Sequence, residues 1–257
     1  MKLIKLILGR VFAVWAILVF IATMLIFLIP FFIFSYPARD PAKTRRFVYA
    51  ARIWMAVFMP LIGCPVTVRG KKNFAPGQNY IVVCNHNSLM DVPISVPAIP
   101  GGNKTIAKIE MAKTPIFGVI YKTGSILVDR NRESSRKESY MSMKRVLEMG
   151  LHMCIYPEGT RNKTDQPLKT FHDGAFRLAL DTRKSILPGI IFNTRKALPA
   201  NIPFYLMPHS LSIHFLSPIA VEPNDTTTTL KDRVHAVMTE YYSTEYRTRN
   251  KEFRSSN

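Results

Sequence analysis

The sequence predicts an α/β fold in which a single sheet is flanked by helices and preceded by an N-terminal helical membrane anchor. Short β-rich apolar segments alternate with helical segments from Val66 onward, which is typical of a domain built on a largely buried sheet. Before them lies an uncharged run of 24 residues, Val11–Phe34, rich in Ile, Leu, Val and Phe. The chain has 257 residues, 47% of them hydrophobic, which is enough for one core-bearing domain and this additional segment.

The apolar run is long enough to reach across a bilayer, because a helix rises about 1.5 Å per residue and the hydrocarbon core is ~30 Å thick. A secretory signal peptide is the alternative, since Lys2, Lys5 and Arg10 precede the run. The run is too long for a typical signal peptide and no small-residue cleavage site follows it, so we expect it to be retained. Both flanks are basic, so the positive-inside rule does not settle the orientation, and both a single span and a helical hairpin that dips in and returns fit the pattern.

A second helix is predicted over Thr44–Ile62, where apolar residues recur at helical spacing. Such a helix either lies on the membrane or pairs with the first helix, and an ordinary core-facing helix fits the pattern equally well. Basic residues before and within it are placed to meet anionic lipid head groups: Arg39, Lys43, Arg45, Arg46 and Arg52.

The formal net charge of +18 indicates a phosphate-rich partner, either nucleic acid or an anionic membrane with anionic substrates. Nucleic acid is not expected, because the chain has no zinc-finger spacing, no aromatic RNA-binding segment and no basic heptad helix. The apolar run favours an anionic membrane surface. Three widely spaced cysteines, Cys64, Cys84 and Cys154, indicate no disulfide framework and no metal site. We therefore expect the working domain in a reducing compartment, on the cytosolic face of a membrane.

The chain divides into membrane-anchoring helices at 1–64, an α/β domain at 65–245 and a basic polar tail at 246–257. Within the α/β domain, helices are expected over Glu133–Glu148, with Gly150 as its cap, and over Asp173–Thr182. Seven strands are expected: Val66–Val68, Tyr80–Val83, Thr105–Ala107, Ser125–Val128, Leu151–Tyr156, Ile186–Phe192 and Leu211–Phe215.

A histidine and an aspartate follow the strand that ends near Cys84, in the segment NHNSLMD. Imidazole is the side chain best suited to act as a base near neutral pH, so His86 can serve as one, while the carboxylate of Asp91 can fix its tautomer. Five residues turn about 500° on a straight helix, so the two side chains would not share a helical face. His86 must therefore lie in the turn with Asp91 on the first helical turn behind it. Taken alone, the pair also fits a capping aspartate beside a surface histidine.

A second polar segment, YPEGTR, follows the strand-like residues Leu151–Tyr156. Gly159 lets the backbone approach a ligand, and Arg161 presents a planar fork that binds phosphate through two bonds. A third segment, GSILVDR, ends in Arg130. Each could be a plain turn or a surface ion pair by itself. Together they lie at the carboxyl ends of predicted strands, where open α/β sheets gather their ligand sites. A base and two arginines at one edge suit a phosphate-bearing alcohol.

The sequence resembles the phospholipid and glycerol-phosphate acyltransferase family. The family's His-x4-Asp box appears as NHNSLMD, its second block as GSILVDR, its third as YPEGTR and its fourth as ILPGII. The likeness extends in family order from about Pro65 to Ile219. Two departures occur: Leu127 stands where an aromatic is common, and His172 and Asp173 stand where lysines are frequent. These departures affect the assignment of the acceptor more than the fold.

The resemblance implies that His86 is the general base, that Asp91 holds its imidazole, and that no covalent acyl-enzyme is required. It also implies substrate-binding residues: Arg161 would hold the acceptor phosphate, Glu158, Gly159 and Thr160 would shape its loop, and Arg130 and Lys108 would assist. The reaction would need no cofactor, and acyl-CoA or acyl-carrier protein would be the co-substrate. The other histidines lack metal-ligand spacing, so no metal is expected.

The implied function is transfer of a fatty acyl group to the 2-hydroxyl of 1-acyl-glycerol-3-phosphate, giving phosphatidate in phospholipid biosynthesis. The partners would be a lysophosphatidate-like lipid, an acyl thioester and the membrane. Within the same family, the acceptor could instead be another lysophospholipid, a lyso-aminolipid or glycerol-3-phosphate. From a different class, a non-catalytic anionic-lipid-binding protein would share the charge and the apolar run, but the intact His86 and Asp91 favour an enzyme.

Overall fold

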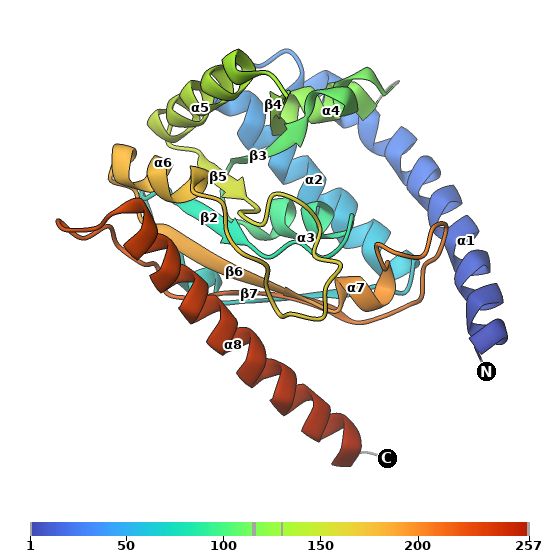
Figure 1. Ribbon diagram of the computed structural model, residues 1–257. Coiled ribbons are helices and arrows are strands. Elements are labelled where there is room, and N and C mark those ends of the chain that lie inside the picture. The colour runs from blue at the N-terminus through green and yellow to red at the C-terminus, as the bar shows by residue number, and fades with distance from the viewer. Residues whose placement is uncertain (1, 115–116, 130, 256–257) are drawn as a thin grey trace.

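A seven-stranded sheet organises the chain in the computed structural model, which describes residues 2–114, 117–129 and 131–255 (Figure 1). The strand order is β1-β7-β6-β2-β5-β3-β4. The predicted α/β fold class, with helices flanking one sheet and a long apolar N-terminal helix, is confirmed. All seven predicted strands are present: β1 (Val66–Arg69), β2 (Ile81–Cys84), β3 (Asn103–Lys108), β4 (Ser125–Val128), β5 (His152–Ile155), β6 (Ile186–Phe192) and β7 (Leu211–Phe215).

The central strands β6, β2, β5, β3 and β4 all run in parallel, while β7 is antiparallel to β6 and β1 is parallel to β7. Parallel strands bring their carboxyl ends to the same edge of the sheet. The loops that follow β2, β5 and β6 therefore meet there. Every residue of these three strands is buried, which explains why they read as continuous apolar runs rather than alternating ones.

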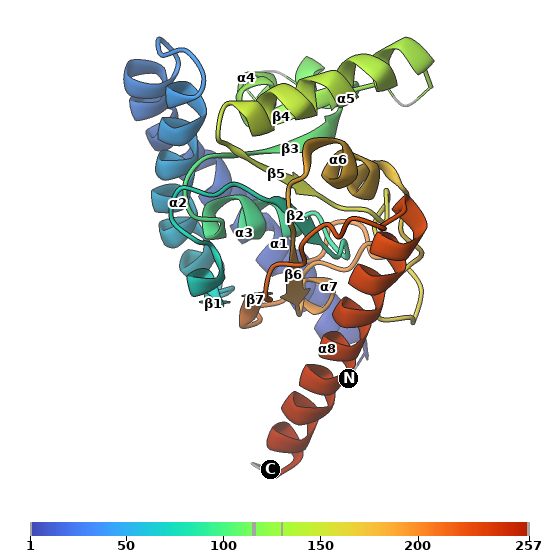
Figure 2. The same cartoon turned by 90° about the vertical axis from the view of Figure 1, so that its left-hand side faces the viewer.

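Helices cover both faces of the sheet (Figure 2). On one face, α3 (Asp91–Ala98) lies against the strands, and α2 (Ala42–Leu61) and α1 (Lys2–Pro30) lie outside it. On the other face lie α5 (Glu133–Glu148), α6 (Gly174–Thr182) and α8 (Thr227–Ser255). The shorter helical elements are η1 (Phe31–Ser35), η2 (Lys71–Asn73), η3 (Ile109–Lys113), α4 (Phe117–Gly124) and α7 (Thr194–Ala197).

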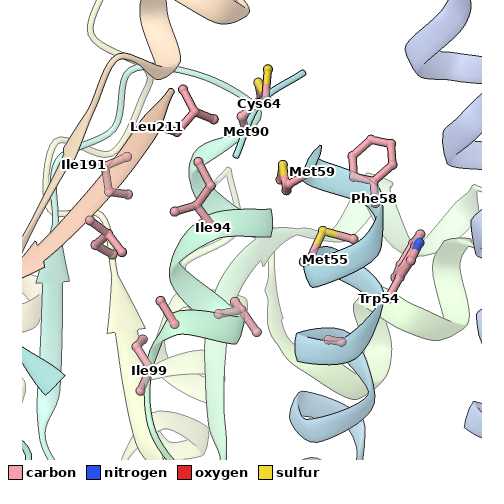
Figure 3. Close-up of a cluster of buried hydrophobic side chains, with 14 of the residues drawn as sticks. Trp54, Met55, Phe58, Met59, Cys64, Met90, Ile94, Ile99, Ile191 and Leu211 are labelled. Atoms are coloured by element: carbon pink, nitrogen blue, oxygen red, sulfur yellow. The ribbon is translucent and has the colours of Figure 1, made fainter. Parts of the chain in front are cut away.

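The apolar core on the α3 side continues from the sheet to the outer helices. In Figure 3, Ile94 of α3 lies between the strand residues Ile191 and Leu211 on one side and Met59 of α2 on the other. These side chains are all buried. Because successive strand residues point to opposite faces, Val82 belongs to this core while its neighbour Ile81 belongs to the core under α5, α6 and α8.

The two N-terminal helices form a hairpin held by aromatic contacts. The indole of Trp54 stacks on Phe27 with ring centroids 4.8 Å apart and donates a hydrogen bond of 2.9 Å to the Thr23 hydroxyl. The indole of Trp15 donates to the Leu61 carbonyl at 2.9 Å. Among the described residues, one helix is long and apolar enough to cross a membrane, Leu3–Ser35.

The second helix pairs with the first and also packs on α3, as the core-facing alternative anticipated. Its basic residues are not all directed at lipid, and for Arg52 that expectation was wrong. Its guanidinium donates to the Pro97 and Ile99 carbonyls at 2.8 and 3.0 Å, at the C-terminus of α3. Arg46 donates to the Phe34 carbonyl at 3.0 Å. These bonds satisfy helix-end carbonyls that have no partner within their own helix.

The residues expected to form a polar tail from 246 onward continue helix α8 as far as Ser255. In Figure 1 this helix extends beyond the sheet at its C-terminal end. Gly150 lies two residues after the end of α5 and has a positive φ of 70°, and its amide donates to the Leu147 carbonyl at 3.0 Å, which confirms the predicted cap.

Candidate active site

The site is built from two loops that follow neighbouring parallel strands. His86 lies in the turn between β2 and α3, and Glu158 to Arg161 lie in the loop after β5. Strands β2 and β5 are paired with Val82 opposite Cys154. The two loops therefore leave the same edge of the sheet side by side.

The imidazole of His86 is bound by Asp91. Its Nδ1 lies 2.8 Å from Oδ2 of Asp91, which is the first residue of α3 and is fully buried. The same oxygen accepts the backbone N–H groups of Asn87 and Ser88 at 2.6 and 2.7 Å. The turn folds back over the helix N-terminus, and this brings together two side chains that a straight helix would separate.

This pairing prepares His86 for proton transfer. A carboxylate acceptor places the imidazole hydrogen on Nδ1, so Nε2 carries the lone pair. The side chain of His86 is 19% exposed, and Nε2 has no hydrogen-bond partner in the described part of the chain. The other oxygen of Asp91 is buried and likewise without a partner among the described residues. The negative charge of the Asp91 carboxylate is therefore available to stabilise the imidazolium that forms when Nε2 of His86 gains a proton.

The ring of Tyr156 holds the imidazole from one side. The two ring centroids are 4.6 Å apart, with the planes inclined by 32°. The phenol oxygen lies 2.7 Å from the Ser95 hydroxyl of α3, which fixes the tyrosine in turn. Burial raises the pKa of Tyr156 well above its usual value, so the ring stays a neutral phenol beside the base. Both the Nδ1 bond and this packing therefore limit rotation of His86.

The YPEGTR loop also binds the backbone of His86 on both sides. Oε1 of Glu158 accepts the His86 amide at 2.8 Å, and the amide of Asn162 donates to the His86 carbonyl at 2.6 Å. Oε2 of Glu158 accepts the amide of Lys169 at 3.1 Å. Burial raises the pKa of the Glu158 carboxyl, and these amide bonds oppose that rise. Glu158 is 1% exposed, so its carboxylate is directed at the backbone rather than at an incoming ligand.

The next three residues form the tip of the loop. Gly159 has a φ of +69°, and a Cβ added there would lie 2.7 Å from the ring of His172, so only glycine fits without strain. The Thr160 hydroxyl accepts a hydrogen bond of 2.8 Å from the Lys169 ammonium group. Within the described residues, the guanidinium of Arg161 makes no hydrogen bond or ion pair. It is therefore a cation available to a ligand, one residue from the Asn162 amide that binds the His86 carbonyl.

The two remaining residues predicted to bind substrate, Lys108 and Arg130, do not belong to these two loops. Lys108 is the last residue of β3 and is exposed, at the same sheet edge but with β5 between its strand and β2. No described contact links it to His86. Arg130 lies outside the described residues.

Sequence reasoning missed the residues that hold the loops. Asn85 precedes His86 and bonds both the N–H and the carbonyl of Ile191 in β6, at 2.7 and 3.0 Å. Asn162 and Lys169 join the second loop to His86 and Glu158 as described above. An amide at a strand end directly beside a candidate base is a signal that could have identified Asn85. Nothing in the sequence marks Lys169.

The arrangement joins the loop that carries His86 to the loop that carries Arg161. Among the described residues, no group of three or more His, Cys, Asp or Glu side chains could hold a metal ion. Such a site can take a proton from a hydroxyl group whose molecule carries an anionic group for Arg161 to hold.

Comparison with known proteins places the chain in a family. The profile of the Acyltransferase family matches residues 65–192, which contain both loops. The chain is 33% identical over 168 residues to a 1-acyl-sn-glycerol-3-phosphate acyltransferase of Cocos nucifera, covering 65% of this chain and 53% of that protein. It is 27% identical over 190 residues to the protein of the same name from Borreliella burgdorferi, covering 71% and 75%. The chain thus spans about half the length of the coconut relative.

A solved structure shares the fold. The crystal structure of the 1-acyl-sn-glycerophosphate acyltransferase from Thermotoga maritima superposes with a TM-score of 0.76 at 22% sequence identity, covering 96% of this chain and 98% of that one. At this identity the likeness shows the fold. The family profile, which matches both loops, shows that the chain belongs to the Acyltransferase family.

Proposed function

We propose that this protein transfers a fatty acyl group from an acyl thioester to the 2-hydroxyl of 1-acyl-glycerol-3-phosphate, forming phosphatidate. One observation carries the proposal: the YPEGTR loop, which bears Arg161, is hydrogen-bonded to the backbone of His86, whose imidazole is paired with Asp91. A base and a phosphate-binding cation are thereby held at one place. The names of the relatives support this choice of acceptor.

The reaction needs one proton to move twice. Nε2 of His86 takes the proton from the acceptor hydroxyl while the oxygen attacks the thioester carbonyl, and Asp91 stabilises the imidazolium. The tetrahedral intermediate then expels the thiolate, which takes the proton from His86. General base catalysis supplies about 10²–10⁴-fold, and holding the acceptor in near-attack geometry removes ~7–11 kcal/mol of barrier. Binding the phosphate therefore contributes at least as much as the base.

The acceptor phosphate is assigned to Arg161, since the described residues offer its guanidinium no partner and planar guanidinium groups bind phosphate through two bonds. In this proposal Gly159 and Thr160 shape the loop, and Glu158 acts through the backbone of His86. Lys108 and Arg130 would add positive charge at the same edge. The donor is acyl-CoA or acyl-carrier protein. If the acceptor is instead another lysophospholipid or glycerol-3-phosphate, the same base serves it.

We further propose that α1 lies along the membrane surface with the catalytic domain on the cytosolic face. Contacts are spread along α1, because Leu206 of the α/β domain bonds Gly9 and helix α2 contacts Trp15 and Thr23. If α1 crossed the bilayer, the loop that carries Leu206 would be drawn toward hydrocarbon, where its backbone groups would lose water. The opposite side of α1 is exposed and apolar, which suits the interface. Three buried free cysteines fit a reducing compartment.

Replacing the base tests the proton transfer. We expect His86→Ala to lower the rate of acyl transfer by about 10²–10⁴-fold or more, because the variant loses the group proposed to take the hydroxyl proton. His209→Ala is the matched control, since the Nδ1 of His209 contacts the carbonyl of its neighbour Pro208. Transfer from a labelled thioester to 1-acyl-glycerol-3-phosphate is measured, with thermal unfolding to show that both variants fold. Turnover near that of the control would remove His86 from the mechanism.

Replacing the cation tests acceptor binding. Arg161→Ala should raise the KM for the phosphorylated acceptor by about 10–100-fold, the cost of one lost charge-assisted contact, with much less effect on the donor KM. Lys163→Ala, an exposed cation two residues away, serves as control and should change neither constant by more than about twofold. Equal rises for donor and acceptor would count against the assignment.

Replacing the bridging carboxylate tests how His86 is positioned. Glu158→Gln turns one of the two acceptor oxygens into an NH₂ group that faces a backbone N–H. We expect the free energy of unfolding to fall by ~1–3 kcal/mol and kcat to fall more than the acceptor KM rises. Chemical unfolding and initial rates are measured, with the exposed Glu148→Gln as control. A folded variant with unchanged kcat would show that the bridge does not position the base.

A further inference from the structure

The loop between α7 and β7, residues 198–210, connects the histidine turn with the N-terminal helix. At its start, the Ser88 hydroxyl donates to the Leu198 carbonyl at 2.8 Å. Further along, the amide of Leu206 donates to the Gly9 carbonyl in α1 at 2.9 Å. The loop therefore runs from the turn that carries His86 to the helix proposed to lie on the membrane, and Figure 1 shows it reaching toward α1.

The contact with α1 is close. The ring of Tyr205 packs directly on Gly9, where an added Cβ would lie only 2.1 Å from a ring carbon. Only glycine permits this approach, so the loop is seated on the helix rather than passing over it. The position of the loop relative to α1 is thus defined by a hydrogen bond and by packing.

The loop exposes an apolar side chain beside this contact. Phe204 is 50% exposed and has a φ of +52°, a left-handed backbone conformation that is unfavourable for a residue with a large side chain. At the other end of the loop, Leu89 follows the bonded Ser88 and is 62% exposed. The strained backbone at Phe204 is the kind of feature that gathers at ligand-contacting sites, and here it holds an aromatic ring at the surface beside α1.

The surroundings indicate which partner. Gly9 itself is buried under the loop, but its neighbours Ile7 and Leu8 in α1 are exposed, so the contact next to Phe204 is bordered by apolar side chains suited to lipid. Two exposed cations, Lys5 and Arg10, lie within one helical turn of Gly9. Apolar side chains bordered by cations match the boundary between acyl chains and anionic head groups.

We propose that residues 198–206 form a second membrane-contacting element, in which Phe204 inserts among the lipid acyl chains beside α1. The loop would hold the histidine turn at the surface from which a lipid acceptor enters. The lipid contact stands on its own geometry, whereas its effect on catalysis rests on the proposed acyl transfer.

Depth of insertion tests the contact without reference to catalysis. Phe204→Cys is labelled with an environment-sensitive fluorophore, which is selective because Cys64, Cys84 and Cys154 are buried. The full chain is reconstituted on vesicles of phosphatidylcholine and phosphatidylglycerol with brominated acyl chains. We expect blue-shifted, quenched emission at position 204. The control label at Asn224→Cys, an exposed position in the turn before α8, should stay unquenched. Figure 1 shows that α8 begins on the side of the molecule away from α1. Equal, solvent-like emission at both positions would overturn the proposal.

Kinetics test what the contact does. Phe204→Asn keeps a residue that tolerates the left-handed backbone but removes the apolar ring. We expect about a three- to tenfold rise in apparent KM for long-chain 1-acyl-glycerol-3-phosphate presented in vesicles, from losing the burial of a half-exposed ring. For a water-soluble short-chain acceptor, the apparent KM of Phe204→Asn should equal that of the unaltered protein. Phe204→Trp should keep the KM of the unaltered protein for the vesicle acceptor. Asn201→Ser, an exposed polar change in the same loop, is the control.

Each outcome has a distinct meaning. An equal loss with both acceptors, or no change with either, contradicts a membrane role for the loop. If the unaltered protein acylates neither acceptor, the proposed function fails, and the quenching at position 204 still decides whether the loop contacts lipid.

Discussion

The carboxylate of Glu158 connects the two halves of the candidate site. Its oxygens accept the amides of His86 and Lys169, so one buried side chain ties the turn after β2 to the loop after β5. The Asn162 amide completes the connection at the His86 carbonyl. If the two loops moved apart, one oxygen of this buried carboxylate would lose its hydrogen bond, at a cost of ~1–3 kcal/mol. The hydrogen-bonded arrangement of the two loops is therefore the more stable one. The distance from base to cation is therefore set by the backbone, and the paired strands β2 and β5 make that possible.

The same turn is also connected to the surface proposed to face lipid. Ser88, within the histidine turn, bonds the loop that is seated on α1, and α1 presents an apolar side away from the domain. In the proposed function, a lipid acceptor would keep its acyl chain in the membrane and present its phosphate and hydroxyl to Arg161 and His86.

Much of the fold could be predicted because periodicity reports local structure: all seven strand segments and the helix Glu133–Glu148 are where the sequence indicates. The order of the strands and the antiparallel entry of β7 depend on long-range pairing, which residue patterns do not contain. In the candidate site, the sequence shows which residue types can act as a base or bind phosphate. It does not show which hydrogen bonds these residues make. Glu158 serves the backbone of His86, and Arg52 serves the end of α3 instead of a lipid head group, because burial decided what each charge could reach.

The central claim is that one phosphorylated alcohol contacts both His86 and Arg161. A crystal structure of the protein with 1-acyl-glycerol-3-phosphate, solved without a donor, tests it most directly. The account predicts the phosphate on the Arg161 guanidinium and the free hydroxyl within about 2.6–3.2 Å of Nε2 of His86. A lipid bound with its phosphate away from Arg161, or with its hydroxyl out of reach of His86, would contradict it.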